Sequence, residues 1–258
     1  MPTRDSYAQG TPNWVDLQTT NQAAAKAFYG GLFGWSYDDQ PMDGGAVYSI
    51  AKIGDESVAA IAPQSPELAA AGAPSMWNTY LAVDSVDETS AKVGPAGGTV
   101  AMEPFDVMDA GRMAFVLDPS GAAVALWQAG THIGSSLVNE PGTVVWNELI
   151  TDNPVAVTFY EQVLGVTTTT VDMGGNKYTM FQVGGKEVGG TTPPMMEGVP
   201  NHWHVYFAVA DTDAAAAKVT ELGGSVMVPP FDTPIGKMAV VSDPQGAVFS
   251  FFQASAPA

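Results

Sequence analysis

The chain lacks cysteine and has few basic residues. Because none of its 258 residues is cysteine, disulfides, thiolate nucleophiles and sulfur-ligated metal sites are excluded. Only nine Lys and Arg residues oppose 27 Asp and Glu residues, and the formal net charge is −18. Binding to a phosphate backbone or to an anionic lipid surface depends on cationic side chains. We therefore expect neither a nucleic acid nor a membrane as partner.

Long apolar runs are also missing. No stretch of the sequence is long enough to span a bilayer, and the first residues, MPTRDSYAQG, have neither the basic head nor the apolar stretch of a signal peptide. The expected location is the cytoplasm, with export without a signal peptide as the alternative.

What the sequence does contain is repetition. Trp14, Trp77, Trp146 and Trp203 each open a strand-like run: WVDLQT, WNTYLAV, WNELIT and WHVYFAV. The two halves of the chain match over their whole length. The matched pairs are AAAKAFYGGLFGW (23–35) with VAVTFYEQVLGV (155–166), GGAVYSI (44–50) with GGNKYTM (174–180), and EPFDVMDAGRMAFVLDPSGAAVALWQA (103–129) with PPFDTPIGKMAVVSDPQGAVFSFFQA (229–254). Such a repeat indicates that each copy is a structural unit.

Each quarter of the chain is predicted to form a strand, a helix and then further strands. Asn21 can cap the first helix and Gly34 can end it, and the DPSG and DPQG sequences are typical of turns between the last two strands of each half. In the first half the expected strands are 11–19, 35–39, 45–52, 56–62, 77–83, 99–103, 112–117 and 123–128, and the second expected helix is 86–94. The predicted domains are 10–130 and 142–256, joined by a linker at 131–141.

These features resemble the vicinal oxygen chelate superfamily, which holds glyoxalase I, bleomycin-resistance proteins and extradiol dioxygenases. The resemblance rests on FYGGLFGW, FYEQVLGV, DPSG and DPQG in register, and it covers residues 10–255. It implies an α+β fold of tandem duplicated glyoxalase-like domains, each made of two βαβββ units that form a curved mixed sheet around a cleft. The sequence is most similar to an actinobacterial tandem subgroup of glyoxalase-like or hydroxylase-like proteins that includes a culture-filtrate antigen.

The resemblance also implies where metal-using relatives place their ligands. Those positions hold Trp14, Asn78, Trp146 and His204 on first strands, and Ala60, Ala125, Gly190 and Ser250 on last strands. Only His204 is a usual ligand, whereas a catalytic metal with an open site needs about three. We expect neither a bound metal nor another cofactor.

Side chains two residues apart on a strand share a face, so the cleft positions extend along each strand. The predicted ligand-binding residues of the first half are Trp14, Asp16, Tyr48, Asn78, Tyr80 and Trp127. Those of the second half are Trp146, Glu148, Tyr178, His204, Tyr206, Ser250 and Phe252. Both sets combine aromatic surface with a few polar groups, as small-molecule sites do. Trp77 and Trp203 point the other way and are expected in the core.

Glu148 and His204 are the candidate catalytic residues. A carboxylate beside an imidazole can act as an acid-base pair, although two buried polar groups can also simply satisfy each other. His132 and His202 lie in linker or turn sequence, and we expect them to be solvated. Arg112 and Lys237 occupy matching positions in the two halves and are expected to form salt bridges.

Three functions are compatible with this sequence. The first is a metal-free protein that binds a small aromatic or electrophilic metabolite. The second is a metal-independent isomerase, lyase or hydroxylase-like enzyme that uses Glu148 and His204. The third is a secreted or surface interaction protein, which only the antigen resemblance suggests. The chain is expected to be a monomer with an internal pseudo-dimer, or a homodimer.

Overall fold

A computed structural model describes residues 3–172 and 177–255. Residues 174–176 of the predicted repeat, and residue 256 at the end of the second predicted domain, lie outside the described residues. The elements of the first half are β1 Pro12–Thr19, α1 Gln22–Phe33, β2 Ser36–Pro41, η1 Asp43–Gly45, β3 Val47–Ile53, β4 Glu56–Pro63, α2 Pro66–Ala70, β5 Met76–Ala82, α3 Val86–Val93, β6 Thr99–Val107, β7 Gly111–Leu117 and β8 Ala123–Ala129. Those of the second half are β9 Val144–Ile150, α4 Pro154–Leu164, β10 Thr167–Asp172, β11 Lys177–Val183, β12 Lys186–Thr192, β13 His202–Ala208, α5 Thr212–Glu221, β14 Ser225–Thr233, β15 Gly236–Ser242 and β16 Val248–Ala254.

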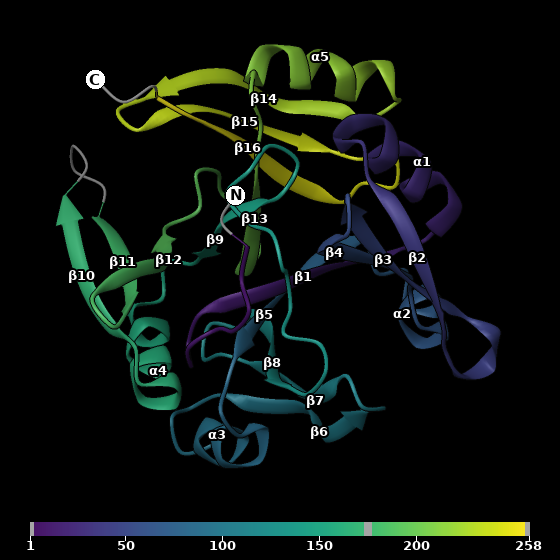
Figure 1. The fold of residues 1–258 in the computed structure, drawn as a ribbon. Coiled ribbons are helices and arrows are strands. Elements are labelled where there is room, and N and C mark those ends of the chain that lie inside the picture. Colours follow the sequence, from purple (N-terminus) through teal and green to yellow (C-terminus); the bar gives the residue numbers. More distant parts are fainter. Residues whose placement is uncertain (1–2, 173–176, 256–258) are drawn as a thin grey trace.

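Each half forms one eight-stranded mixed sheet (Figure 1). The strand order is β2-β3-β4-β1-β5-β8-β7-β6 in the first half and β10-β11-β12-β9-β13-β16-β15-β14 in the second. In both sheets the first strands of the two βαβββ units pair antiparallel at the centre, and each also pairs parallel with the last strand of its own unit. The predicted fold class is confirmed.

Local sequence explains where the first helix of each half begins and ends. Asn21 Oδ1 accepts a hydrogen bond from the backbone N–H of Ala24, and Asn153 Oδ1 accepts one from Val155. Gly34 and Gly165 then end α1 and α4 in the left-handed conformation, at φ 74° and 75°, which costs glycine no steric penalty. The short helix α2 has no counterpart in the sequence prediction.

The two halves share their hydrophobic cores. One core joins β1, α1 and Trp77 of the first half to Phe207 and Phe249 of the second. The other joins Leu81 and neighbouring strands of the first half to α4 and Trp203 of the second. Figure 1 accordingly shows α1 beside the last strands of the second half. Trp77 and Trp203 are only 6% and 5% exposed, which confirms that they are core residues.

The family-like motifs meet at this interface. Tyr160 of α4 donates to Asp118 Oδ2 of the DPSG turn at 3.0 Å and accepts from Trp203 Nε1 at 2.8 Å. In the symmetric arrangement, Tyr29 of α1 donates to Asp243 of the DPQG turn and accepts from Trp77 Nε1. Each tyrosine therefore ties a helix of one half to a turn of the other.

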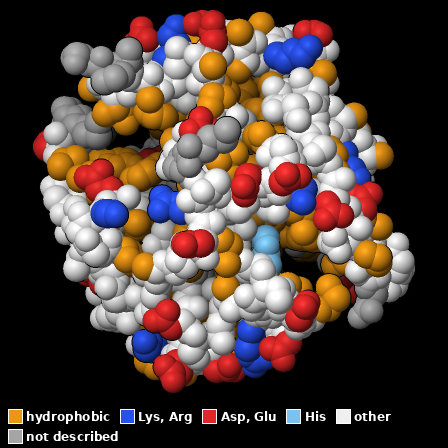
Figure 2. Space-filling view, viewed as in Figure 1, with side chains coloured by type: hydrophobic (Ala, Val, Ile, Leu, Met, Phe, Trp, Pro, Cys, Tyr) orange, Lys and Arg blue, Asp and Glu red, His pale blue; other side chains and the backbone are white. Residues whose placement is uncertain are grey.

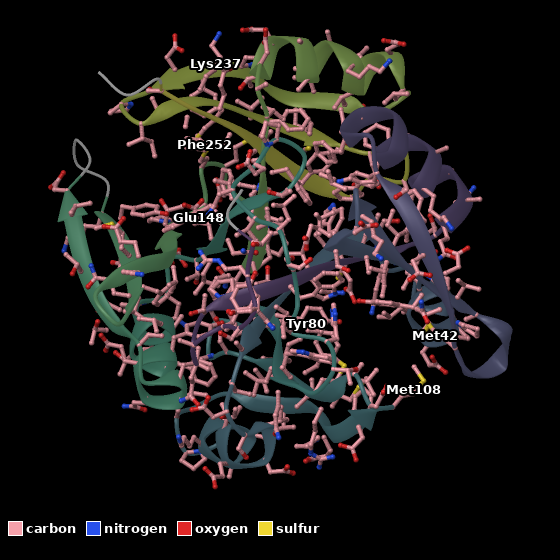
Figure 3. All side chains as sticks on the ribbon, viewed as in Figure 1. Met42, Tyr80, Met108, Glu148, Lys237 and Phe252 are labelled. Carbon is pink, nitrogen blue, oxygen red and sulfur yellow. The ribbon has the colours of Figure 1, made fainter. Side chains whose placement is uncertain are left out.

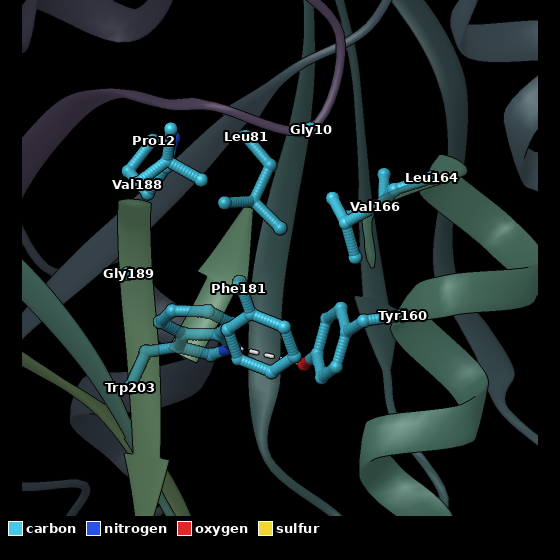
Figure 4. A pocket seen from close by; sticks show the side chains of 10 residues that line it. All are labelled: Gly10, Pro12, Leu81, Tyr160, Leu164, Val166, Phe181, Val188, Gly189 and Trp203. Carbon is cyan, nitrogen blue, oxygen red and sulfur yellow. Dashed lines mark hydrogen bonds between the residues drawn. The ribbon is translucent and has the colours of Figure 1, made fainter. Parts of the chain in front are cut away.

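Figure 4 shows the surroundings of Tyr160, with the bond to Trp203 dashed. The apolar cavity there lies between the halves, beneath Gly10 and Leu81, and has a volume of about 10 Å³. That is room for about one water molecule. The cavity is a packing gap and not a ligand site.

The predicted salt bridges of Arg112 and Lys237 lie on the surface of the structure. Arg112 pairs with Asp87 and Asp106, and Lys237 pairs with Asp213, which confirms the predicted salt bridges. Within residues 3–172 and 177–255, no helix has the length and apolar character needed to cross a membrane.

Candidate functional site

The inner face of each curved sheet gathers the predicted ligand-binding side chains. We call the sets headed by Asp16 and Glu148 the first and second cleft. In the first cleft, direct contacts link all the predicted residues. In the second, contacts link all but Phe252, which follows Ser250 by two residues on the same face of β16. Figure 3 labels Tyr80 in the first sheet, and Glu148 and Phe252 in the second.

Asp16 lies at the floor of the first cleft and is 2% exposed. Its carboxyl group accepts hydrogen bonds from Tyr80 Oη at 2.6 Å, Asn78 Nδ2 at 2.8 Å and Tyr48 Oη at 3.2 Å. Trp14 Nε1 donates to Tyr48 Oη at 2.8 Å. Burial raises the pKa of Asp16, and these donors offset part of that rise.

Glu148 occupies the same place in the second cleft and is 6% exposed. Its Oε2 accepts from Tyr206 Oη at 2.8 Å, and Tyr178 also hydrogen-bonds the carboxyl group. Trp146 Nε1 donates to Tyr178 Oη at 2.8 Å. Burial raises the pKa of Glu148. Both clefts thus contain a tryptophan, two tyrosines and a buried acid in one hydrogen-bonded set.

His204 replaces Asn78 in the second cleft and makes different contacts. It lies directly opposite Glu148 on the neighbouring strand, but its hydrogen bonds go to Ser250 Oγ at 2.7 Å and His202 Nε2 at 3.4 Å. Glu148 in turn is held by the two phenols. Burial lowers the pKa of His204 to about 3, so the imidazole is neutral near pH 7.

The expectation that His132 is solvated was wrong. Its ring packs edge-on against Trp14, with centroids 4.5 Å apart, and its carbonyl oxygen accepts from Trp127 Nε1 at 2.8 Å. Burial lowers the pKa of His132 to about 4. The physical reason is that residues 130–132 donate backbone hydrogen bonds to the β6–β7 turn, which holds the segment over the first cleft. Nothing in the sequence predicted that residues 130–132 would lie over the first cleft.

His202 also departs from the solvated prediction. It is half-buried on β13, where its Nδ1 bonds the carbonyl oxygen of Pro200 at 2.8 Å and its Nε2 contacts His204. Sequence reasoning missed this contact, although the i, i+2 spacing on a strand places His202 and His204 on one face.

The floors of the two clefts differ in exposure. Trp14, Tyr80 and Trp127 of the first cleft are 4%, 5% and 6% exposed. The matching Trp146, Tyr206 and Phe252 of the second cleft are only partly buried. In Figure 2 a hollow on the left, on the side of the second sheet, is lined by apolar side chains, and another at the lower right has a histidine at its edge. The second cleft offers the more accessible aromatic surface.

The metal-ligand positions of the superfamily do not fit a metal in this chain. Ala60, Ala125 and Gly190 offer no side-chain donor at all, and a Cβ added to Gly190 would collide with the hydroxyl group of Tyr178. The phenol therefore fills the space that a ligand from β12 would need. Among the described residues, no three His, Asp or Glu side chains are grouped so that they could hold a metal ion.

Comparison with known proteins agrees with this fold. The model of the Glyoxalase/Bleomycin resistance protein/Dioxygenase superfamily matches residues 11–126 and 144–251. Since these matches cover most of the chain, the protein belongs to that superfamily.

Individual relatives narrow the comparison. The chain is 58% identical over 254 residues to "Putative glyoxylase CFP32" of Mycobacterium bovis, with 97% of each chain covered. It is 39% identical over 256 residues to "Anthracycline biosynthesis protein DnrV" of Streptomyces peucetius, with 95% of this chain and 93% of that protein covered.

Solved structures show the same fold at low sequence identity. The Mn(II)-bound glyoxalase of Novosphingobium aromaticivorans is 18% identical with a TM-score of 0.65, covering 96% of this chain and 83% of that one. The 2,3-dioxygenase LapB of Pseudomonas sp. KL28 is 16% identical with a TM-score of 0.66, covering 98% and 96%. These likenesses concern the fold alone.

Proposed function

We propose that the protein binds a small planar aromatic molecule, without a metal, in the second cleft. The observation that carries the proposal is the exposure difference between the clefts. Trp146, Tyr206 and Phe252 are partly exposed around a buried carboxyl group, whereas His132 covers the matching surface of the first cleft. Aromatic walls with few polar groups are typical of small-molecule sites.

Charge narrows the ligand class. The side chains gathered in the second cleft include no Lys or Arg, and the chain carries a net charge of −18. An anionic ligand would meet Glu148 without a compensating cation. These charges disfavour an anionic ligand, and because burial raises the pKa of Glu148 and so favours its uncharged form, we favour a neutral ligand. A relative named for the biosynthesis of anthracyclines, which are polycyclic aromatic compounds, supports this class.

Calorimetric titration with a neutral probe such as 1-hydroxyanthraquinone tests the proposal. Trp146→Ala should weaken binding by about tenfold, the upper range for a lost aromatic pair, whereas the matched substitution Trp14→Ala should not change it. The proposal fails if Trp14→Ala weakens binding and Trp146→Ala does not, or if wild-type protein purified without added metal carries close to one equivalent of a transition metal.

A second candidate is a metal-independent isomerase, lyase or hydroxylase-like enzyme. It is favoured by Glu148, because a buried carboxyl group with a raised pKa in a cleft is suited to acid-base chemistry. Glu148→Gln should then abolish turnover of a substrate found by screening while retaining binding. Asp16→Asn is the matched control and should leave turnover intact. A role as a secreted or surface interaction protein remains a prediction, and so does the oligomeric state, a monomer with an internal pseudo-dimer or a homodimer.

A further inference from the structure

A continuous chain of polar contacts runs from the floor of the second cleft to the protein surface. Tyr206 Oη donates to Glu148 Oε2 at 2.8 Å, and Ser250 lies directly opposite Tyr206 on the neighbouring strand β16, where its hydroxyl group contacts the phenol. Ser250 Oγ lies 2.7 Å from His204 Nε2, and His204 Nδ1 lies 3.4 Å from His202 Nε2. His202 Nδ1 then bonds the carbonyl oxygen of exposed Pro200.

The Pro200 carbonyl fixes the direction of this chain. A carbonyl oxygen only accepts, so neutral His202 must carry its proton on Nδ1 and present Nε2 as an acceptor. His204 must then donate from Nδ1, which leaves its Nε2 free to accept the hydroxyl proton of Ser250. The links from Ser250 to Pro200 are thereby oriented to receive a proton from the side of Glu148, whereas the Tyr206 hydroxyl group donates to Glu148.

The first cleft holds no such chain. Met76, Asn78 and Ala125 stand where the second half has His202, His204 and Ser250. Tyr80 and Asp16 remain, so the carboxyl and phenol are common to both halves. The three residues that would conduct a proton onward occur only in the half whose cleft is more accessible.

We propose that Tyr206, Ser250, His204 and His202 form a proton relay between Glu148 and the surface at Pro200. In the outward step, Glu148 in its protonated form donates to Tyr206 Oη, and the phenol hydroxyl turns from Glu148 to Ser250. The carboxyl proton then passes to Tyr206, and the phenol proton passes to Ser250. The hydroxyl proton of Ser250 then passes to His204 Nε2, and the Nδ1 proton of His204 passes to His202 Nε2. The result is a Glu148 carboxylate and a His202 imidazolium, which returns its extra proton to water. No electron or other group is transferred.

The charged surroundings of the relay are limited. The titratable groups that face Glu148 are the phenols of Tyr178 on β11 and Tyr206 on β13, and Glu187 on β12 acts on Tyr178. His204 lies opposite Glu148 on β13, and His202 is the titratable neighbour of His204. The relay rests on the proposed function in one respect only, since it assumes that Glu148 is the group that meets the ligand.

Nitrogen-15 NMR of histidine side chains in ligand-free protein tests the direction of the relay. The chain has three histidines, so single His→Gln variants assign every signal. At neutral pH, His202 and His204 should both be Nδ1-protonated. His202→Gln should shift His204 toward the Nε2-protonated form, and the control His132→Gln should leave it unchanged. An Nε2-protonated His204 in the wild-type protein would overturn the relay.

The rate of proton movement tests conduction itself. Trp146 reports on Glu148 through Tyr178, so its fluorescence should relax after a rapid pH jump. Trp146→Phe should remove the signal. Ser250→Ala should slow the relaxation at least about tenfold with unchanged end points, whereas a merely structural role would move the end points. Equal rates with the wild-type protein would exclude the relay. Neither experiment uses a ligand, so failure of binding would be seen separately.

Discussion

Replacing Tyr160 by phenylalanine should destabilise the whole protein, because its hydroxyl group is bonded to buried residues of both halves. Tyr160 is 2% exposed, and its partners Asp118 and Trp203 are 3% and 5% exposed. Tyr160→Phe leaves the ring in place but removes the acceptor for Trp203 Nε1 and the donor to Asp118 Oδ2. Asp118 keeps its bonds from Ser120 and Ala122 through Oδ1.

The expected loss follows from the groups left unpaired. A buried neutral donor without a partner costs about 1–3 kcal/mol, and a lost hydrogen bond to a charged group about 1.5–3 kcal/mol. The free energy of unfolding should therefore fall by about 2.5–6 kcal/mol, which is a large share of the stability of an ordinary domain. Tyr29→Phe should act similarly through Asp243 and Trp77.

Urea unfolding followed by circular dichroism measures this loss. Tyr37→Phe is the matched control. The Tyr37 hydroxyl group donates to the backbone carbonyl of Lys26, so this bond is part-buried and lies within one half. The control should cost about 1 kcal/mol. If Tyr160→Phe costs no more than the control, or if only the second half loses structure, the two halves do not depend on this bond and the shared-core interpretation is wrong.

Further predictions concern acid, packing and the interface. Because the folded-state pKa values of His132 and His204 lie at about 4 and about 3, below the ordinary 6.5, the unfolded chain binds the extra protons and stability falls as pH drops below 6.5. Between pH 7 and pH 5, the free energy of unfolding measured with urea should therefore fall by about 2 kcal/mol less for His132→Gln than for the wild-type protein. An equal fall in the two proteins would refute the burial of His132. Gly190→Ala should displace the Tyr178 phenol, cost about 1–3 kcal/mol and weaken probe binding in calorimetry, while normal binding would contradict the placement of Tyr178. The two halves, produced separately, should expose their shared cores and bind a hydrophobic dye, and mixing them should restore the native circular dichroism; a stable, dye-free single half would argue against shared cores.

The sequence predicted the repeat, the fold and the inward-facing positions well, because each depends on local patterns. Strand alternation placed Asp16 and Glu148 on the inner faces, and the position of Trp77 and Trp203 relative to the cleft residues placed them in the core. The repeat also led to the salt bridges of Arg112 and Lys237. These features need only the period of a strand or the register of the repeat.

What the sequence could not predict depends on contacts between distant segments. The exchange of helices between the halves arises from packing of α1 and α4 on the other half's turns. The covering of the first cleft depends on where the backbone of residues 130–132 finds its hydrogen bonds. The direction of the histidine chain depends on one carbonyl group, that of Pro200. None of these has a local sequence period.

The remaining acceptor capacity of the two acids supports the proposal that the second cleft, and not the first, binds a ligand. An ionised carboxyl group has about four lone-pair sites. Asp16 accepts from three side chains, because Asn78 adds to the two phenols. At Glu148 the residue in the place of Asn78 is His204, which turns to Ser250 instead, so the carboxyl group is held by the phenols alone. The exchange of Asn for His therefore frees an acceptor at the cleft floor, and it supplies the His204–His202 contact on which the proposed relay depends.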